Sequence, residues 1–204
     1  MIAAHGRLAV RGKGRPRNRV SVWERAMSKK PSTTAFRIEP ASAGDWPWIV
    51  QGEIEIAWAR LGPKGREEVD RHTVEERTEK RISELLEDAG FQSRGFVART
   101  EDGTLAGYVW VARTHNDSTG RLEAALLNQY VAEPYRGRGL GYRLMETAED
   151  WARREGLPRI SLFVGAQNTL GQRLYQSLGY EVETLRMTKK LLGAVEDELE
   201  MATE

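Results

Sequence analysis

Apolar residues along the chain follow two periods, one typical of strands and one typical of helices. Residues 34–39 alternate between apolar and polar side chains, which predicts a strand. A stripe at three- and four-residue steps comes next, made of Trp46, Val50, Ile54, Trp58 and Leu61. It predicts a helix that Asp45 caps and that Gly62, followed by proline, ends.

Further along the chain, the same two periods alternate again. The expected elements are a helix over 73–89, strands over 95–100 and 105–112 joined by an Asp-Gly turn, a long strand over 122–131, a helix over 139–155, a short strand over 160–164, a helix over 168–178 and a last strand over 180–191. This order predicts an α/β (α+β mixed) fold, a mixed sheet with helices on both faces.

The composition is that of a globular protein. Of 204 residues, 40% are hydrophobic and 30% charged. No apolar run approaches the roughly 20 residues of a membrane helix, so no membrane partner is expected. A cytoplasmic protein is expected, because a chain without cysteine is compatible with a reducing compartment. The chain has no cysteine, which excludes disulfides, thiolate metal sites and a cysteine nucleophile. Its three histidines are scattered, and no metal site is expected.

Charge divides the chain into three parts. Residues 1–30 carry nine Lys or Arg and one acidic residue, although the whole chain has a net charge of only +1. We interpret residues 1–33 as a disordered basic extension, 34–191 as the domain and 192–204 as an acidic tail. The simplest explanation of this extension is a translation start placed too early, with Met27 as the true start. A transit peptide and a nucleic-acid-binding tail stay open as alternatives, although only Trp23 places an aromatic ring among the basic residues.

The sharpest local signal is the segment Val131-Ala-Glu-Pro-Tyr-Arg-Gly-Arg-Gly-Leu-Gly141. A strand ends, a proline turns the chain, glycines follow and a helix starts at once. Backbone N–H groups can approach an anion closely at such a junction, and the start of the helix adds a partial positive charge. Arg136 and Arg138 add full charges, so a pyrophosphate is the expected ligand. A tight turn that only lets the helix pack remains the simpler alternative.

Two better-known phosphate motifs do not fit this segment. A P-loop needs Gly-Lys followed by Ser or Thr, but Tyr142 and Arg143 follow the glycines. A dinucleotide fingerprint that starts at Gly137 needs glycine or alanine at position 142.

A second segment, from Asn168 to Tyr180, narrows the choice. Asn168 suits a helix N-cap, and Gly179 suits its end. Tyr175 lies beside the apolar stripe of this helix, where a core tyrosine is the simpler interpretation. Together the two segments resemble the GNAT superfamily of N-acetyltransferases. Its cofactor motif Gln/Arg-x-x-Gly-x-Gly/Ala is matched by Arg136, Gly139 and Gly141, and its later motif by Asn168, Tyr175, Gly179 and Tyr180.

The resemblance covers about residues 34–190 and implies a mostly antiparallel, twisted sheet of six to seven strands. It also implies acetyl-CoA as cosubstrate, with the pantetheine arm between the splayed fourth and fifth strands. The residues implied for cofactor binding are Tyr130, Val131, Ala132, Arg136, Gly137, Arg138, Gly139, Leu140, Gly141, Tyr142, Asn168 and Tyr175. Near Tyr130, Val131 and Ala132 the backbone would bind the arm, and the amides of 136–141 would hold the pyrophosphate.

In this family an amine attacks the thioester directly, and the tyrosine at the position of Tyr175 protonates the departing thiolate. The base is open. Glu123 would share a strand face with Val131 if no bulge intervened. Glu53 and Glu55 on the first helix are further candidates. For each of the three, a solvated surface carboxylate is the simpler interpretation.

The acceptor is expected to be a cationic amine, either a small molecule or a peptide N-terminus or lysine. Glu53 and Trp48 are the expected substrate contacts, since carboxylates and aromatic faces attract ammonium groups. Phe163 stands where bacterial ribosomal-protein alanine acetyltransferases carry glutamate, which counts against that subfamily. A CoA-binding sensor or scaffold without turnover is the alternative function. A homodimer is possible, and nucleic acid is not an expected partner.

Overall fold

The computed structural model describes residues 35–88 and 90–189, which form two compact units that meet in the sequence at Phe163 and Val164. The first unit contains β1 (Arg37–Pro40), α2 (Trp46–Glu68), α3 (Arg71–Glu87), β2 (Ser93–Arg99), β3 (Leu105–His115), β4 (Leu122–Val131), α4 (Leu140–Arg154) and β5 (Ile160–Leu162). The second contains α5 (Thr169–Ser177). The predicted basic extension (1–33) and acidic tail (192–204) lie outside the described residues.

The strands form one sheet in the order β1-β2-β3-β4-β5, antiparallel except for the parallel pair β4 and β5. This confirms the mixed, mostly antiparallel sheet. The expected count of six to seven strands was too high, because the described residues contain five. The last strand, predicted over 180–191, is absent from residues 180–189, which have no regular secondary structure. An apolar pattern alone does not show whether a partner strand is within reach.

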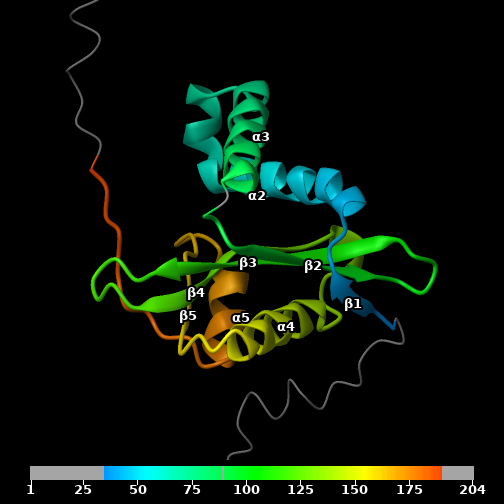
Figure 1. Ribbon diagram of the computed structural model, residues 1–204. Coiled ribbons are helices and arrows are strands. Elements are labelled where there is room, and N and C mark those ends of the chain that lie inside the picture. Colours follow the sequence, from blue (N-terminus) through cyan, green and yellow to red (C-terminus); the bar gives the residue numbers. More distant parts are fainter. Residues whose placement is uncertain (1–34, 89, 190–204) are drawn as a thin grey trace, which may run out of the picture. The chain divides into compact units, whose positions relative to one another are not determined.

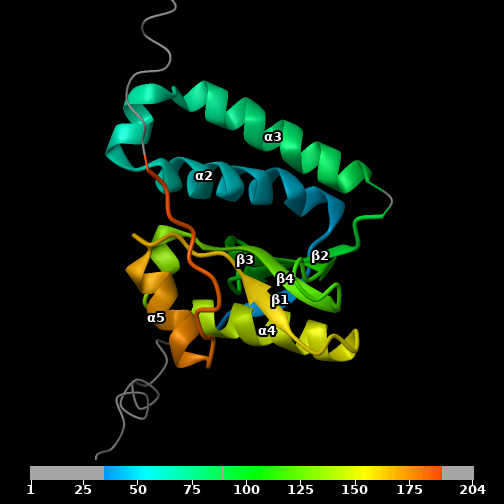
Figure 2. The ribbon, with the colours of Figure 1, turned by 90° about the vertical axis from the view of Figure 1, so that its left-hand side faces the viewer.

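Helices cover both faces of the sheet, as predicted (Figure 1). One face bears a core of Ile49, Ile82, Val97, Tyr108 and Trp110, drawn from α2, α3, β2 and β3. Figure 2 shows that α2 lies between α3 and the sheet. On the other face α4 buries Leu140, Leu144, Met145 and Ala148. Among the helices within the described residues, none has the length and apolar character that crossing a membrane requires.

The first helix begins where the sequence predicts, but its start and end differ in detail. Asp45 occupies the N-cap position without bonding to the helix. Its carboxylate instead accepts a 2.9 Å hydrogen bond from the Ser42 N–H and pairs with Arg99. Gly62 breaks the helix with a φ of 65°. A further helical turn then continues to Glu68, so the break at Gly62 is a kink rather than the end.

A bulge in β4 sets the geometry of the region that the sequence singles out. Trp110 pairs with Asn128 and Val111 pairs with Leu126, so Leu127 has no partner on β3. β5 pairs with β4 only from Ala124 to Leu126, which is where the bulge begins. The bulge therefore coincides with the point where the pairing of β4 and β5 stops.

Candidate active site

Beyond the bulge, the edge of β4 that faces away from β3 presents backbone groups. The Ala132 N–H donates to the Ala106 carbonyl at 2.9 Å, which makes these two residues a hydrogen-bonded pair. Pairs alternate along an antiparallel ladder, so Val131 opposite Gly107 and Gln129 opposite Val109 are non-hydrogen-bonded pairs. The N–H and C=O groups of Gln129 and Val131 therefore point away from β3. An extended ligand can bind there as an added strand.

The glycine loop follows directly after this edge. Gly137 and Gly139 have φ values of 73° and 76°, and Gly139 is the N-cap of α4. A Cβ at either glycine would meet no atom within 4 Å. The glycines are therefore required by the backbone conformation and not by close packing. As the N-cap, Gly139 has no side chain that could accept a hydrogen bond from the first N–H groups of α4, which makes the start of this helix a candidate anion site.

Two hydrogen bonds fix the loop to β4. The Arg136 side chain donates from Nε to the Val131 carbonyl at 2.9 Å. Gln129 donates from Nε2 to the Gly141 carbonyl at 2.6 Å. The guanidinium of Arg138 lies 5.9 Å from the centre of the Tyr135 ring. The loop and the open edge of β4 thus form one connected surface.

A carboxylate is buried between α2 and the face of the sheet that α2 covers, although the sequence predicted a solvated one. Glu53 on α2 is 1% exposed. Its Oε1 accepts a 2.9 Å hydrogen bond from the Tyr108 hydroxyl, and its Oε2 accepts one from the Asn128 side-chain amide. Gly52 makes room for this arrangement, since a Cβ there would lie 3.0 Å from the Tyr108 hydroxyl oxygen. The expectation of a surface carboxylate was wrong for Glu53.

Burial changes the acidity of both partners. Desolvation raises the pKa of Glu53 above its ordinary value, and the hydrogen bonds from Tyr108 and Asn128 and the charges of Arg81 and Arg60 oppose this rise. Burial and the neighbouring Glu53 carboxylate raise the pKa of Tyr108 well above 10.0. Tyr108 therefore stays a hydrogen-bond donor, while Glu53 can take up a proton more readily than a solvated glutamate.

Two arginines complete the cluster from the helical layer. Arg60 donates from Nη2 to the Asn128 Oδ1 at 2.7 Å. Arg81 on α3 approaches the Glu53 Oε2 to 3.5 Å, and its side chain stays 54% exposed. Sequence reasoning missed Tyr108, Asn128, Arg60 and Arg81. The one available signal was a polar asparagine near the end of the apolar run of β4.

Aromatic rings lie next to this cluster. Tyr108 and Tyr130 stack with ring centres 5.8 Å apart, and Trp48 meets both edge-to-face at 5.9 and 5.8 Å. Trp48, predicted as a substrate contact, is half-buried in this group. Tyr130 extends the aromatic group to the strand whose open edge begins at Gln129.

Residues 57–180 match the acetyltransferase (GNAT) family. The chain belongs to this family.

Relatives within the family include mycothiol acetyltransferases. The protein of that name from Thermobispora bispora is 30% identical over 191 residues, covering 88% of this chain and 59% of its own length. The one from Nocardiopsis dassonvillei is 28% identical over 141 residues, covering 66% and 41%. The chain thus spans only about two fifths to three fifths of these two relatives.

Solved structures give the same fold. An acetyl transferase candidate from Pyrococcus furiosus aligns with a TM-score of 0.67 and 26% identity, over 77% of this chain and all of that one. A GCN5-related N-acetyltransferase from Ralstonia eutropha has a TM-score of 0.61 and 20% identity, over 78% of this chain and 100% of its own.

The later GNAT motif lies in the second unit. The Asn168 side chain accepts a 2.9 Å hydrogen bond from the Gly171 N–H and so caps α5, as predicted. Tyr175 lies on α5 with its ring 5.9 Å from that of Tyr180, and Gly179 follows the helix with a φ of 89°. Phe163, at the end of the first unit, is exposed.

Glu123 and Glu55, the other two candidates for the general base, have surroundings that differ from those of Glu53. Glu123 is 4% exposed, and it accepts a 2.9 Å hydrogen bond from Ser161 and pairs with Arg159 at 3.5 Å. The bulge puts Glu123 and Val131 on opposite faces of β4, so the condition for a shared face is not met. The solvated state expected for Glu123 was wrong. Glu55 is exposed and pairs with Arg71.

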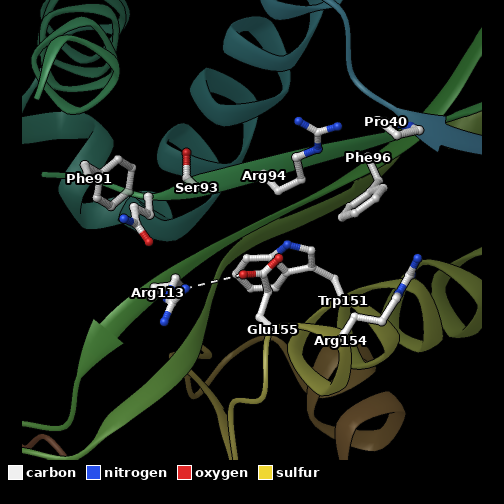
Figure 3. Close-up of a pocket in the computed structure, with 10 residues that line it drawn as sticks. Pro40, Phe91, Ser93, Arg94, Phe96, Arg113, Trp151, Arg154 and Glu155 are labelled. Atoms are coloured by element: carbon white, nitrogen blue, oxygen red, sulfur yellow. Dashed lines mark hydrogen bonds and ion pairs between the residues drawn. The ribbon is translucent and has the colours of Figure 1, made fainter. Parts of the chain in front are cut away.

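One cavity in the described residues lies elsewhere in the GNAT fold. It measures about 560 Å³ and lies between β2, β3 and the end of α4 (Figure 3). Arg94, Phe96, Trp151 and Arg154 line it, and Arg113 pairs with Glu155 at its margin. Neither the glycine loop nor Glu53 contributes to it, so it is not the site formed by the motif residues.

Proposed function

We propose that this GNAT protein transfers the acetyl group of acetyl-CoA to a primary amine in a ternary complex. The observation that carries the proposal is the open edge of β4, which begins at the bulge and runs directly into the glycine loop. The relatives' name supports acetyl transfer as the reaction type. Their acceptor is not carried over, because the chain spans only part of their length.

The cosubstrate fits this edge in two parts. The outward-facing N–H and C=O of Gln129 and the N–H of Val131 would hydrogen-bond the amide-containing pantetheine arm as a neighbouring strand does, while the Val131 carbonyl is already bound to Arg136. Amides of residues 136–141, with Tyr142 beyond them, would hold the pyrophosphate at the start of α4. Arg136 and Arg138 would add positive charge. Tyr130, Ala132, Leu140 and Asn168 remain predicted contacts by family resemblance.

The acetyl transfer step needs a base and an acid. The nitrogen of the neutral amine attacks the thioester carbon, a C–N bond forms and the C–S bond breaks. Glu53 accepts the proton that the nitrogen loses, directly or through a water. By family resemblance, Tyr175 gives its phenolic proton to the departing thiolate sulfur. Glu53 suits the first role because burial raises its pKa towards the range in which a general base works.

The other carboxylates suit the role of base less well. Glu123 hydrogen-bonds to Ser161 beside the paired part of β5, before the bulge. Glu55 is exposed on the same helix as Glu53 and is held by Arg71. Glu123 remains a predicted catalytic residue, but its surroundings favour a role in fixing β4 to β5.

The alternative is a sensor or scaffold that binds CoA without turnover. A buried carboxylate with a raised pKa and a retained Tyr175 favour the enzyme, since neither is needed for binding alone.

Hydrogen–deuterium exchange with and without acetyl-CoA tests the proposed site. Exchange should slow at Gln129, Val131 and the loop amides of 137–142, and stay unchanged at Ser93–Gly95 on the far side of the sheet. Adding an amine should then release the thiol of CoA. Protection confined to other segments would contradict the site, and protection without thiol release from any amine would favour the scaffold.

A further inference from the structure

The proposed function leaves the acceptor unnamed, and the charges around Glu53 narrow its class. We propose that the acceptor amine carries an acid group, a carboxylate or a phosphate, near its nitrogen, and that Arg60 and Arg81 bind this group. The proposal rests on acetyl transfer at the β4 edge. It departs from the cationic acceptor that the sequence predicted.

The carboxylates behind the cationic expectation already have guanidinium partners. Glu53 has Arg81 at 3.5 Å, and Glu55 has Arg71 in a short ion pair. Trp58, a further aromatic residue of this helix, faces Arg66 and Arg71 with their guanidinium carbons 5.0 and 5.9 Å from the ring centre. The protein's own cations thus contact both carboxylates and the Trp58 ring, three of the groups that would attract a cationic amine.

Arg60 stands close to the open edge of β4. Its Nη2 donates to the Asn128 Oδ1 at 2.7 Å, and Asn128 directly precedes Gln129, the first residue with outward-facing backbone groups. The residue is exposed. Within the described residues, the Asn128 contact is its one hydrogen bond, so the other N–H donors of the planar guanidinium are available to an acid group.

Arg81 approaches the same point from α3. Its contact with Glu53 is long, at 3.5 Å, and half of its side chain is in solvent. Two guanidinium groups therefore face a single carboxylate, which leaves a positive charge beside Glu53 in either protonation state of that residue. This charge repels an acceptor with a second ammonium group and attracts one with an acid group.

The spacing also limits the acceptor's size. Arg81 contacts Glu53 itself, and Arg60 contacts Asn128, which donates to Glu53. An acid group bound to Arg81 thus lies close to the proposed base, and one bound to Arg60 lies one side-chain amide further away. Amine and acid must then be close neighbours, as in an amino acid or an amino-alkyl phosphate.

A panel of four small amines separates the possibilities. Alanine carries a carboxylate, alaninamide is its neutral match, phosphoethanolamine carries a phosphate and ethylenediamine a second ammonium. For each, kcat/KM is measured by thiol release and corrected to the fraction of neutral amine. We expect alanine or phosphoethanolamine to exceed both alaninamide and ethylenediamine by about tenfold or more. The faster of the two tells which acid group is preferred.

Arginine variants then locate the preference. In Arg81→Gln and Arg60→Gln, the ratio of the preferred acid-bearing amine to alaninamide should fall about tenfold to a hundredfold. Both kcat/KM values of this ratio are measured with the same variant. A general loss of activity from a disturbed Glu53 lowers both values and therefore does not change their ratio. Arg94→Gln is the matched control and should keep the ratio, because Arg94 lies an odd number of residues from Val97, the β2 partner of Tyr108, and so starts from the opposite face of the sheet.

If turnover is too slow to measure, the binding of the acetylated products can be compared instead. With CoA present, N-acetylalanine should raise the melting temperature more than N-acetylalaninamide, and Arg81→Gln should remove the difference. Equal shifts, a faster ethylenediamine or alaninamide, or an unchanged ratio in both arginine variants would overturn the proposal while leaving acetyl transfer intact. If acetyl-CoA gave neither a thermal shift nor thiol release, acetyl transfer itself would fail.

Discussion

The Tyr108 hydroxyl on β3 donates a 2.9 Å hydrogen bond to Oε1 of Glu53 on α2, two residues 55 positions apart in the sequence. The bond holds a carboxylate under the helical layer, where burial disfavours its charge. Because the pKa of Tyr108 is raised as well, the phenol remains a donor at neutral pH. Glu53 is therefore fixed in orientation and can accept a proton.

Replacing this carboxylate should affect turnover more than binding. Glu53→Gln removes the proposed base, and we expect kcat/KM for the amine to fall about 10²–10⁴-fold with acetyl-CoA affinity largely kept. Glu55→Gln, an exposed carboxylate on the same helix, is the matched control and should change activity little. A loss within a factor of about two in Glu53→Gln, in a variant with an unchanged melting temperature, would leave Glu53 a structural residue.

Glu53 should also give stability a measurable pH dependence. Its pKa is raised above 4.5 in the folded protein, so the stabilising contribution is complete below the unfolded value and is lost as the pH rises through the folded value. Glu53→Gln does not ionise. The melting temperature of Glu53→Gln minus that of the wild type should therefore increase from about pH 4 to about pH 8. A difference that is flat or that decreases over this range would mean that the folded pKa is not raised.

Charge in the glycine loop should decide cofactor binding. Asparagine and aspartate tolerate the left-handed backbone of Gly139, and only aspartate repels a pyrophosphate. At about 100 times Kd, acetyl-CoA should stabilise the wild type by about 2.7 kcal/mol. Gly139→Asp should lose most of this stabilisation and Gly139→Asn less.

The control for the loop is Gly103→Asp, at the β2–β3 turn, where φ is 87° and a Cβ would again meet no atom within 4 Å. It should keep the full acetyl-CoA shift. Equal shifts in Gly139→Asp and Gly103→Asp would place the pyrophosphate elsewhere.

Protonation of the departing thiolate should depend on the phenol of Tyr175. Tyr175→Phe keeps the ring, and as the proposed acid its loss should lower turnover by about 10²–10⁴-fold with acetyl-CoA binding retained. Tyr180→Phe removes the hydroxyl of the neighbouring ring and should not reproduce this loss. Similar turnover in Tyr175→Phe and the wild type would make Tyr175 a packing residue.

Local periodicity predicted the elements that depend on nearby residues. The strand over 122–131 matches β4 at both ends, and the predicted turn holds Gly103 at the positive φ that joins β2 and β3. The cap at Asn168 is also local, since its partner is Gly171. Each of these features is determined within a few residues, where side-chain type directly limits backbone conformation.

The hydrogen bonds around Glu53 could not be predicted from local periodicity. Its hydrogen-bond partners Tyr108 and Asn128 lie 55 and 75 positions away, and a helical stripe does not indicate which strand it will meet. The bulge at Leu127 was equally hidden, since it depends on the pairing of β4 with β3 and not on the residue itself. It places Glu123 on the face opposite Val131, and it coincides with the end of the pairing of β4 with β5.

The fate of a labelled acetyl group tests the central claim most directly. Acetyl-CoA with a deuterated acetyl group is incubated with the protein and the best amine of the panel, and both products are counted by mass spectrometry and thiol titration. Acetyl transfer at the β4 edge predicts one labelled N-acetyl amine for each free thiol, with both rates reduced together in Gly139→Asp. Thiol release without labelled amine, or label transfer unaffected in Gly139→Asp, would contradict it.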